Sequence, residues 1–251
     1  MSVIVKGGGG KSSGLYVWKK YEVIPAYLSF IGNEDFTLKT NNTKKNWDGT
    51  LEYSTDKSTW NIWNGTEISS SGSKLYLRGT GNTKITGRYT DYIFVFTGAD
   101  TLKIACEGNI ENLLDYNTVS AGEHPTMTDH CYANMFRYCR SLTTAPALPA
   151  TTLTNYCYNG MFYGCRSLIT VPALPATTLT NYCYNGMFYG CSLIKLSTTQ
   201  TGEYQTAYRI PMSGIGTTAT DALTDMFTDT GGIFTVTPEI NTTYYTSNTV
   251  I

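Results

Sequence analysis

The chain has 251 residues, 41% of them hydrophobic, which is enough for one large packed domain or two smaller ones. A net charge of −1 excludes the generally basic surface that attracts nucleic acid or anionic membranes. Charged residues make up only 15% of the chain, well below the usual quarter. The surface is therefore expected to be mainly uncharged and polar, as in many extracellular β proteins and carbohydrate-binding proteins.

Residues 1–33 are predicted to be a leader that attaches the chain to something else. The apolar run at its start spans three residues, too short for a signal peptide, and no stretch approaches the ~20 apolar residues of a membrane span. We therefore expect a soluble product without membrane insertion, released by lysis or within a particle if the chain is complete. The stretch Gly7–Ser12 resembles the end of a phosphate-binding loop, but Val5 stands where the first glycine is required. A flexible linker is the favoured interpretation.

Residues 34–100 contain short runs typical of strands, separated by turn-rich stretches. These runs are Phe36–Thr40, Leu51–Ser54, Trp60–Trp63, Lys74–Arg78 and Tyr92–Phe96. Regularly spaced short strands with turn signals between them predict a small antiparallel β-sandwich or barrel, of which we choose the sandwich.

Residues 101–251 carry an internal repeat. Residues 146–165 are identical to residues 172–191, and a looser copy lies a further 26 residues upstream, around Cys131 and Phe136. A fixed period in this range predicts a solenoid, in which each unit buries its apolar face against its neighbours.

Each repeat unit is predicted to hold one short helix and one short strand. Cys157, Met161, Phe162 and Cys165 fall on one stripe of a helix that begins near Thr154 or Asn155 and ends near Gly164. The segment from Leu168 to Leu174 has the character of a strand. The predicted fold is thus mostly β with short helices: a small antiparallel sandwich followed by a leucine-rich-repeat solenoid of 26-residue strand-plus-helix units, with its strands in one parallel sheet. Residues 219–251, with Met226 and Phe227, are predicted to form a degenerate last unit, and Ile104–Leu114 to close the other end.

Six of the seven cysteines recur with the repeat. Cys131, Cys157 and Cys183 share one repeat position, while Cys139, Cys165 and Cys191 share another eight residues later. Because free cysteine behaves as a small hydrophobic residue, this recurrence predicts ladders of buried thiols rather than disulfides. The spacing does not match the closely spaced cysteine pairs of structural zinc sites, so neither a metal nor another cofactor is expected.

The motif C-Y-x-x-M-F-x-x-C-x-S-L-x-x-x-P-x-L-P-A-T-T-L resembles the BspA-like leucine-rich repeats of bacterial surface proteins. The stretch 51–88 resembles the β-rich module that often precedes them, and the leader VKGGGGKSSGLYVWKKYE is similar to leaders of phage and prophage tail-fibre proteins. One departure is Ser192, which follows Cys191 where Cys139 and Cys165 are followed by arginine. We interpret this as the loss of one residue, which leaves the register of the next strand open.

These resemblances imply recognition rather than catalysis, either as an adhesin or as a host-receptor binder. Function depends on sites rather than on fold. His130 aligns with Tyr156 and Tyr182 as a variant of a structural position, and the other histidine, His124, has no expected catalytic partner. Without a convincing nucleophile–base or carboxylate pair, we expect no enzymatic activity.

Tyrosines and arginines are the candidate ligand-binding residues. Tyrosines next to the buried stripe are expected at its edge or outside it, in exposed ladders that could bind sugars or proteins. The alternative is that they only pack one unit on the next. Arginines after the second cysteine could attract an anionic ligand or only solvate a turn. The strand residues that vary between the units, 142–145, 168–171 and 193–196, could determine ligand specificity or could simply be positions that tolerate substitution. The candidate residues are Tyr156, Tyr158, Tyr163, Tyr182, Tyr184, Tyr189, Arg140 and Arg166.

The sequence therefore predicts a non-enzymatic phage or prophage tail-associated protein that binds a cell-surface glycan or protein. The alternatives are a bacterial cell-surface adhesin and a purely structural particle component. The expected location is a virion or the cell exterior. The expected partners are the host receptor, other tail proteins bound through the leader and a possible second copy in a homo-oligomer, with no role for nucleic acid.

Overall fold

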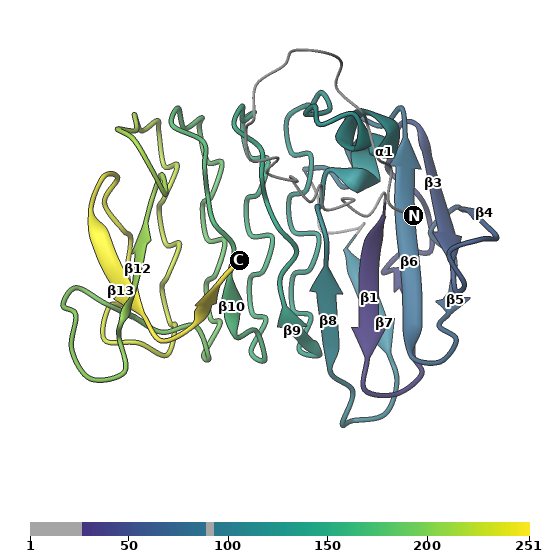
Figure 1. The fold of residues 1–251 in the computed structure, drawn as a ribbon, viewed down its shortest axis with the longest axis horizontal. Helices are drawn as coiled ribbons and strands as arrows, with labels where there is room; N and C mark the ends of the chain where they lie inside the picture. The colour runs from purple at the N-terminus through teal and green to yellow at the C-terminus, as the bar shows by residue number, and fades with distance from the viewer. Residues whose placement is uncertain (1–26, 89–92) are drawn as a thin grey trace, which may run out of the picture.

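A computed structural model describes residues 27–88 and 93–251, which are mostly β (Figure 1). The predicted linker and most of the predicted leader fall in residues 1–26, outside the described residues. The single α-helix of the described part is α1 (Asn112–Ser120). The mostly β class is thus confirmed.

Two sheets occupy the N-terminal half. The larger has the order β4-β3-β6-β1-β8-β9, and the smaller has the order β5-β2-β7. All neighbouring pairs are antiparallel except β8 and β9. The strands are β1 (Leu28–Gly32), β2 (Thr37–Thr40), β3 (Thr50–Ser54), β4 (Asn61–Trp63), β5 (Ile68–Ser69), β6 (Lys74–Thr80), β7 (Phe94–Thr97), β8 (Ile104–Glu107) and β9 (Leu142–Thr144). Each of the five runs predicted between residues 36 and 96 contains a strand, although Tyr92 lies outside the described residues.

Aromatic side chains join these sheets to each other and to the repeats. The ring of Phe30 in β1 lies 5.1 Å from that of Phe96 in β7, and Trp63 in β4 lies 5.3 Å from Phe94. Phe94 in turn contacts Phe136 of the first repeat unit at 6.0 Å. One buried hydrophobic cluster therefore runs through both halves of the chain. The domain boundaries at residues 33 and 100 stay predictions.

The helix predicted in each repeat unit is wrong. Residues 155–164 form consecutive turns, with positive φ at every fourth residue: Tyr156 (59°), Gly160 (57°) and Gly164 (73°). A right-handed helix cannot contain such residues. Alternate backbone N–H groups instead donate to the next unit, as from Tyr156 to the Asn181 carbonyl at 2.9 Å. The intervening N–H groups donate three residues back.

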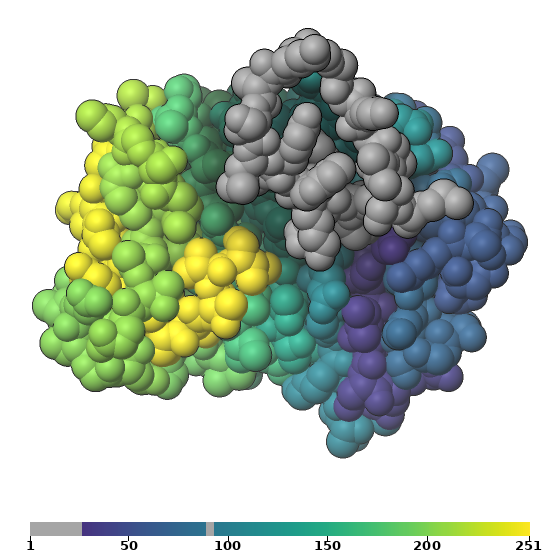
Figure 2. Space-filling view, viewed as in Figure 1, coloured from purple at the N-terminus to yellow at the C-terminus, as the bar shows by residue number. Residues whose placement is uncertain are grey.

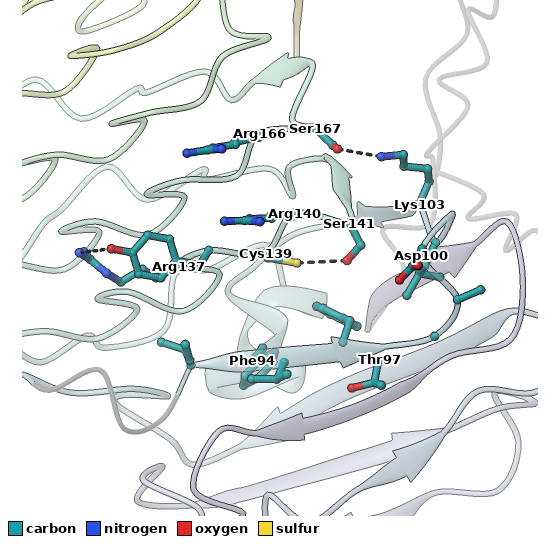
Figure 3. A pocket seen from close by; sticks show the side chains of 17 residues that line it. Phe94, Thr97, Asp100, Lys103, Arg137, Cys139, Arg140, Ser141, Arg166 and Ser167 are labelled. Carbon is teal, nitrogen blue, oxygen red and sulfur yellow. Dashed lines mark hydrogen bonds between the residues drawn. The ribbon is translucent and has the colours of Figure 1, made fainter.

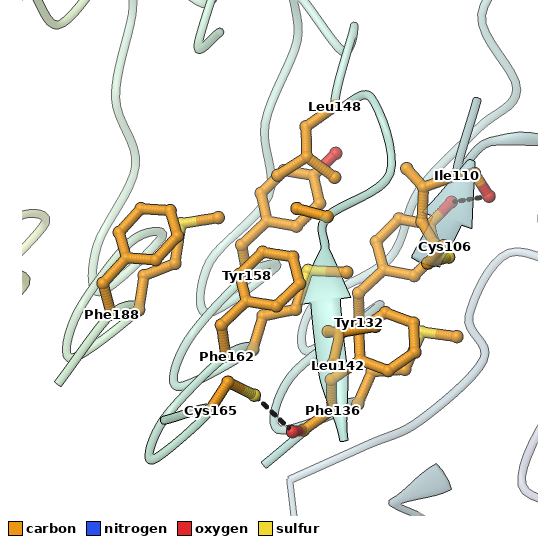
Figure 4. Packing of buried hydrophobic residues seen from close by; sticks show 14 of the residues in the cluster. Cys106, Ile110, Tyr132, Phe136, Leu142, Leu148, Tyr158, Phe162, Cys165 and Phe188 are labelled. Carbon is orange, nitrogen blue, oxygen red and sulfur yellow. Dashed lines mark hydrogen bonds between the residues drawn. The ribbon is translucent and has the colours of Figure 1, made fainter. Parts of the chain in front are cut away.

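This backbone ladder stacks equivalent side chains directly on one another. The rings of Phe136, Phe162 and Phe188 follow one another at 5.7 and 5.6 Å (Figure 4), and Phe227 follows at 5.5 Å. All of these pairs lie within 7° of parallel. Phe227 belongs to the predicted last unit, and the N–H of Phe188 donates to the carbonyl of Met226 at 3.0 Å. Met226 and Phe227 therefore continue the stack of the repeats, while the last unit of residues 219–251 stays a prediction.

The first unit is covered from two sides. As predicted, the segment that begins at Ile104 lies against it: the N–H of Ile104 donates to Ser141 and that of Ile110 to Ala147, at 2.8 and 3.1 Å. Residues that had not been predicted there cover the turns, since the N–H of Ile85 donates to the carbonyl of Cys131 at 2.9 Å.

The strands of successive units do not form the single parallel sheet that we expected. β10 (Thr170–Val171) pairs with β14 (Thr249–Val250), and β11 (Leu196–Ser197) pairs with β13 (Thr243–Thr246), which also pairs with β12 (Thr206–Arg209). The C-terminal segment thus returns across the units, where it is drawn in yellow (Figures 1 and 2). Asn248 secures it by donating to the carbonyls of Ile169 and Leu193 at 3.0 and 2.9 Å.

No residue is lost after Cys191, so that interpretation is wrong, and the strand keeps the register of the preceding unit. The N–H of Ile194 donates to the Cys191 carbonyl at 3.0 Å, just as Leu168 donates to Cys165 at 3.1 Å. Ile194 is fully buried, whereas Leu193 is 44% exposed. Ser192 therefore takes the place of Arg166 in its unit.

All seven cysteines are free and buried, as the thiol ladders predicted. The Sγ atoms of Cys165 and Cys191 each donate to a carbonyl of the preceding unit, those of Phe136 and Phe162, at 3.0 Å. Burial raises the pKa of Cys191 to about 12. These thiols serve as packing groups rather than nucleophiles.

Candidate functional site

Two of the predicted binding tyrosines are part of the core. Tyr158 and Tyr184 are each 1% exposed and stack with Tyr132, so the expected exposed ladder of these residues is wrong. The reason is the turn at every fourth residue: Tyr158 lies midway between Tyr156 and Gly160, which have positive φ, and faces inward as Phe162 does four residues later. Tyr132 donates its hydroxyl to the carbonyl of Ile110 at 3.3 Å.

Tyr156 and Tyr182 belong to an outer row that His130 begins. Successive ring centroids are 4.5 Å apart, and the rings lie within 5° of parallel. His130 is thus the predicted variant of a structural position, and burial lowers its pKa. A hollow of about 400 Å³ lies beside this row, lined by His130, Tyr156, Arg88 and Asn159.

Tyr163 and Tyr189 belong to a second outer row, which Arg137 begins. The guanidinium of Arg137 lies 3.8 Å from the ring centroid of Tyr163, and Tyr189 follows Tyr163 at 4.5 Å with an angle of 1°. Arg137 also donates to Asn134 Oδ1 at 3.2 Å and to the Tyr138 hydroxyl at 3.3 Å. At the other end of the row, a hydrogen bond to Asp229 raises the pKa of Tyr189. Both faces of Tyr163 are therefore occupied by neighbours.

Tyr138 stands beside this second row with its ring 56% exposed. Its ring packs edge-on against Tyr163 at 5.5 Å. Gly164 makes this packing possible, because a Cβ atom there would lie 2.6 Å from Cδ1 of Tyr138. The positive φ of Gly164 favours glycine for a second reason.

These residues line a groove of about 410 Å³, which we call the tyrosine–arginine groove. It combines the second row with the two arginines that follow the second cysteine of their units. Its lining residues are Tyr138, Arg140, Tyr163, Gly164, Arg166, Tyr189, Gly190, Ser192 and Asp229.

A second hollow shares Tyr138, Arg140 and Arg166 with that groove. It measures about 610 Å³ and extends along β7 and residues 97–103, and we call it the strand hollow (Figure 3). Arg140 and Arg166 extend in the same direction there. Lys103 lies opposite, where its Nζ atom donates to Ser167 Oγ at 2.9 Å.

Arg140 and Arg166 are exposed and have no acidic neighbour within ion-pair distance in the described part of the chain. The ion pairs of that part lie elsewhere, as between Arg78 and Glu52 at 2.8 Å. The two guanidinium groups are therefore available to an external anion.

The strand residues considered as a specificity surface are only partly accessible. Ile169 is 49% exposed, but Thr170 is buried and its hydroxyl accepts the N–H of Ala145 at 2.8 Å. β13 and β14 lie against this side of the units. The strand side is thus partly covered, whereas Tyr138, Arg140 and Arg166 are exposed.

Of the predicted residues, the structure brings together Tyr163, Tyr189, Arg140 and Arg166. It places Tyr156 and Tyr182 in a separate row and buries Tyr158 and Tyr184. Sequence reasoning missed Arg137 and Tyr138, which also line the site. The period of 26 residues contained the signal, since Arg137 aligns with Tyr163 and Tyr138 with Gly164.

Within residues 27–88 and 93–251 there is no cluster of three or more His, Cys, Asp or Glu side chains that could hold a metal ion. No helix among those residues has the length and apolar character needed to cross a bilayer. No protein-family model matches the chain, and searches of curated proteins and solved structures return no significant match.

Proposed function

We propose that this chain is a non-enzymatic recognition protein that binds a cell-surface glycan or protein through the tyrosine–arginine groove. The observation that carries the proposal is the meeting of an exposed ring, Tyr138, with the Tyr163–Tyr189 stack and two exposed arginines in one groove. Aromatic surface and fixed polar groups around a concave site favour ligand binding.

The repeat ladder supports this proposal because it holds the groove rigidly. Tyr163 is fixed by Arg137 on one face and by Tyr189 on the other, so little side-chain entropy is lost on binding. We further propose that residues 101–251 are a solenoid related to leucine-rich repeats, whose units have turns in place of helices, and that residues 34–100 are the small antiparallel sandwich.

The resemblance to tail-fibre leaders and BspA-like repeats supports a place on a phage or prophage tail, with a host receptor as the partner. On this proposal the leader binds other tail proteins and the repeats face the host cell. The protein then acts in a virion or outside the cell.

A glycan array of bacterial cell-surface polysaccharides tests the binding function. The full chain should bind a subset of the glycans, and Tyr138→Ala/Tyr163→Ala should lose most of that signal. Tyr156→Ala/Tyr182→Ala is the matched control, because it removes two rings from the other outer row and should retain binding. Equal loss in both variants, with melting temperatures unchanged, would refute the groove as the site.

A further inference from the structure

The strand hollow gathers cationic groups in a protein whose net charge is −1. Lys103, Arg137, Arg140 and Arg166 all line it, and the acidic side chain among its lining residues is Asp100. Concave sites with charge of one sign concentrate ligands of the opposite sign. The electrostatic field in the strand hollow therefore favours an anion, although the net charge of the whole chain is slightly negative.

Arg140 and Arg166 occupy the same position in neighbouring units. Rings at equivalent positions of neighbouring units lie 4.5–5.8 Å apart, which gives the scale of the step from one unit to the next. Two guanidinium groups on this spacing repel each other, and in the described residues neither has a carboxylate within ion-pair distance. An oxyanion between them would relieve the repulsion and accept charge-assisted hydrogen bonds from both.

The surrounding groups fit an anion attached to a sugar better than a nucleotide phosphate. Single-stranded nucleic acid is held by bases that stack on free aromatic faces. Both faces of Tyr163 are taken by Arg137 and Tyr189, and the exposed ring of Tyr138 is a single platform rather than a row of free faces for successive bases. The strand hollow and the adjoining groove offer hydroxyl groups instead, from Ser141 and Tyr163 respectively, which match the hydroxyl groups of a sugar.

We propose that Arg140 and Arg166 together bind a phosphate or carboxylate group of an anionic cell-surface polysaccharide, with Lys103 and Arg137 beside it. This inference rests on the proposed function and narrows its ligand to charged glycans. Phosphate and carboxylate groups share the required chemistry, because both present negatively charged oxygens that accept hydrogen bonds from two guanidinium groups at once.

The test is calorimetric titration of the full chain with four polymers. Poly(glycerol phosphate) carries phosphate, polygalacturonate carries carboxylate, dextran is neutral and an oligothymidylate is a nucleic acid. We expect binding to at least one of the two charged polysaccharides and none to dextran. The affinity should fall when salt rises from about 50 to 500 mM, because screening shortens the reach of the charges.

The variant Arg140→Met/Arg166→Met should bind the charged polysaccharide about tenfold or more weakly, since each lost bond to a charged group is a strong one. Lys44→Met/Lys45→Met is the matched control, because it also removes two positive charges, from exposed positions outside the groove and the strand hollow. Its affinity for the charged polysaccharide should stay within about twofold of that of the unchanged protein.

Each other outcome overturns the inference. Glycan binding that is unaffected by the arginine variant would leave the proposed function standing and refute the anion site. Preferential binding of the oligothymidylate would replace the polysaccharide with a nucleic acid. Absence of binding to both charged polysaccharides would refute the anion site, while the array result decides the proposed function separately.

Discussion

Replacing Phe162 with alanine should remove a central element of the repeat stack. Phe162 is fully buried, with the rings of Phe136 and Phe188 on its two sides at 5.7 and 5.6 Å. Phe→Ala substitutions in a core cost about 3–5 kcal/mol through lost transfer free energy and the cavity left behind. For a chain of this size that cost lowers the melting temperature by about 6–20 °C.

Phe162→Leu separates stacking from apolar volume. It keeps most of the buried volume but loses two ring pairs, each worth about 0.5–1.5 kcal/mol, so we expect a loss of about 1–3 kcal/mol. Ile169→Ala, at a half-exposed position of the same unit, should cost within about 0.5 kcal/mol and is the matched control. Urea unfolding followed by circular dichroism measures all three. A loss below about 1 kcal/mol for Phe162→Ala would refute the stacked core.

Three further predictions follow from the core, the turns and the titrating groups. The buried thiols of the native protein should resist iodoacetamide at pH 8 and react only in denaturant, because burial raises their pKa, to about 12 for Cys191. Rapid alkylation of the native protein, measured by mass spectrometry, would contradict this. The N–H groups of Thr59 and Ser58 hold the pKa of Asp56 well below its ordinary value. Its contribution to stability is therefore present above the unfolded-state pKa and lost as pH falls through the folded one, so Asp56→Asn should lower the urea midpoint at pH 7 by an amount that shrinks below pH about 4. Gly164→Ala and Gly190→Ala both place a Cβ at positive φ, which should cost about 1–2 kcal/mol of unfolding free energy. Gly164→Ala should cost more, because its Cβ would lie 2.6 Å from the Tyr138 ring, whereas the Cβ at Gly190 would meet nothing nearer than 3.8 Å. Equal losses of unfolding free energy would show that the Tyr138 ring moves aside.

Strands and buried ladders could be predicted because their signals are local or periodic. The runs around Leu38, Leu51 and Leu75 contain the strands that their patterns indicate. The six cysteines of the repeats were placed correctly because a period of 26 residues determines which side chains stack, whatever the backbone between them. Phe227 lies 39 residues after Phe188, and the Met-Phe pair rather than the period indicated its place in the stack.

The backbone between these residues could not be predicted in the same way. A spacing such as that of Cys157, Met161 and Phe162 fits one stripe of a helix, but it also fits a chain that turns every fourth residue. Gly160 and Gly164, four residues apart, were the available signal, while the positive φ of Tyr156 is set by hydrogen bonds to the next unit. Long-range pairing thus overrode the local helical pattern.

The candidate site shows the same limit. Tyr156 and Tyr158 flank one cysteine, and the sequence gives both the same expected exposure, yet one lies in an outer row and the other is buried. Which tyrosine faces outward depends on the turn at every fourth residue, because Tyr156 has positive φ while Tyr158, two residues later, is not among the positive-φ residues. Arg137 became part of the site only because it stacks on Tyr163 of the next unit.

Hydrogen–deuterium exchange of the full chain, with and without purified bacterial cell-wall polysaccharide, tests the proposed recognition surface most directly. We expect slower exchange on binding in residues 137–141, 163–167 and 189–192, which contain side chains that line the groove or the hollow next to it. Slower exchange confined to the row of His130, Tyr156 and Tyr182, or to the C-terminal strands, would contradict this account.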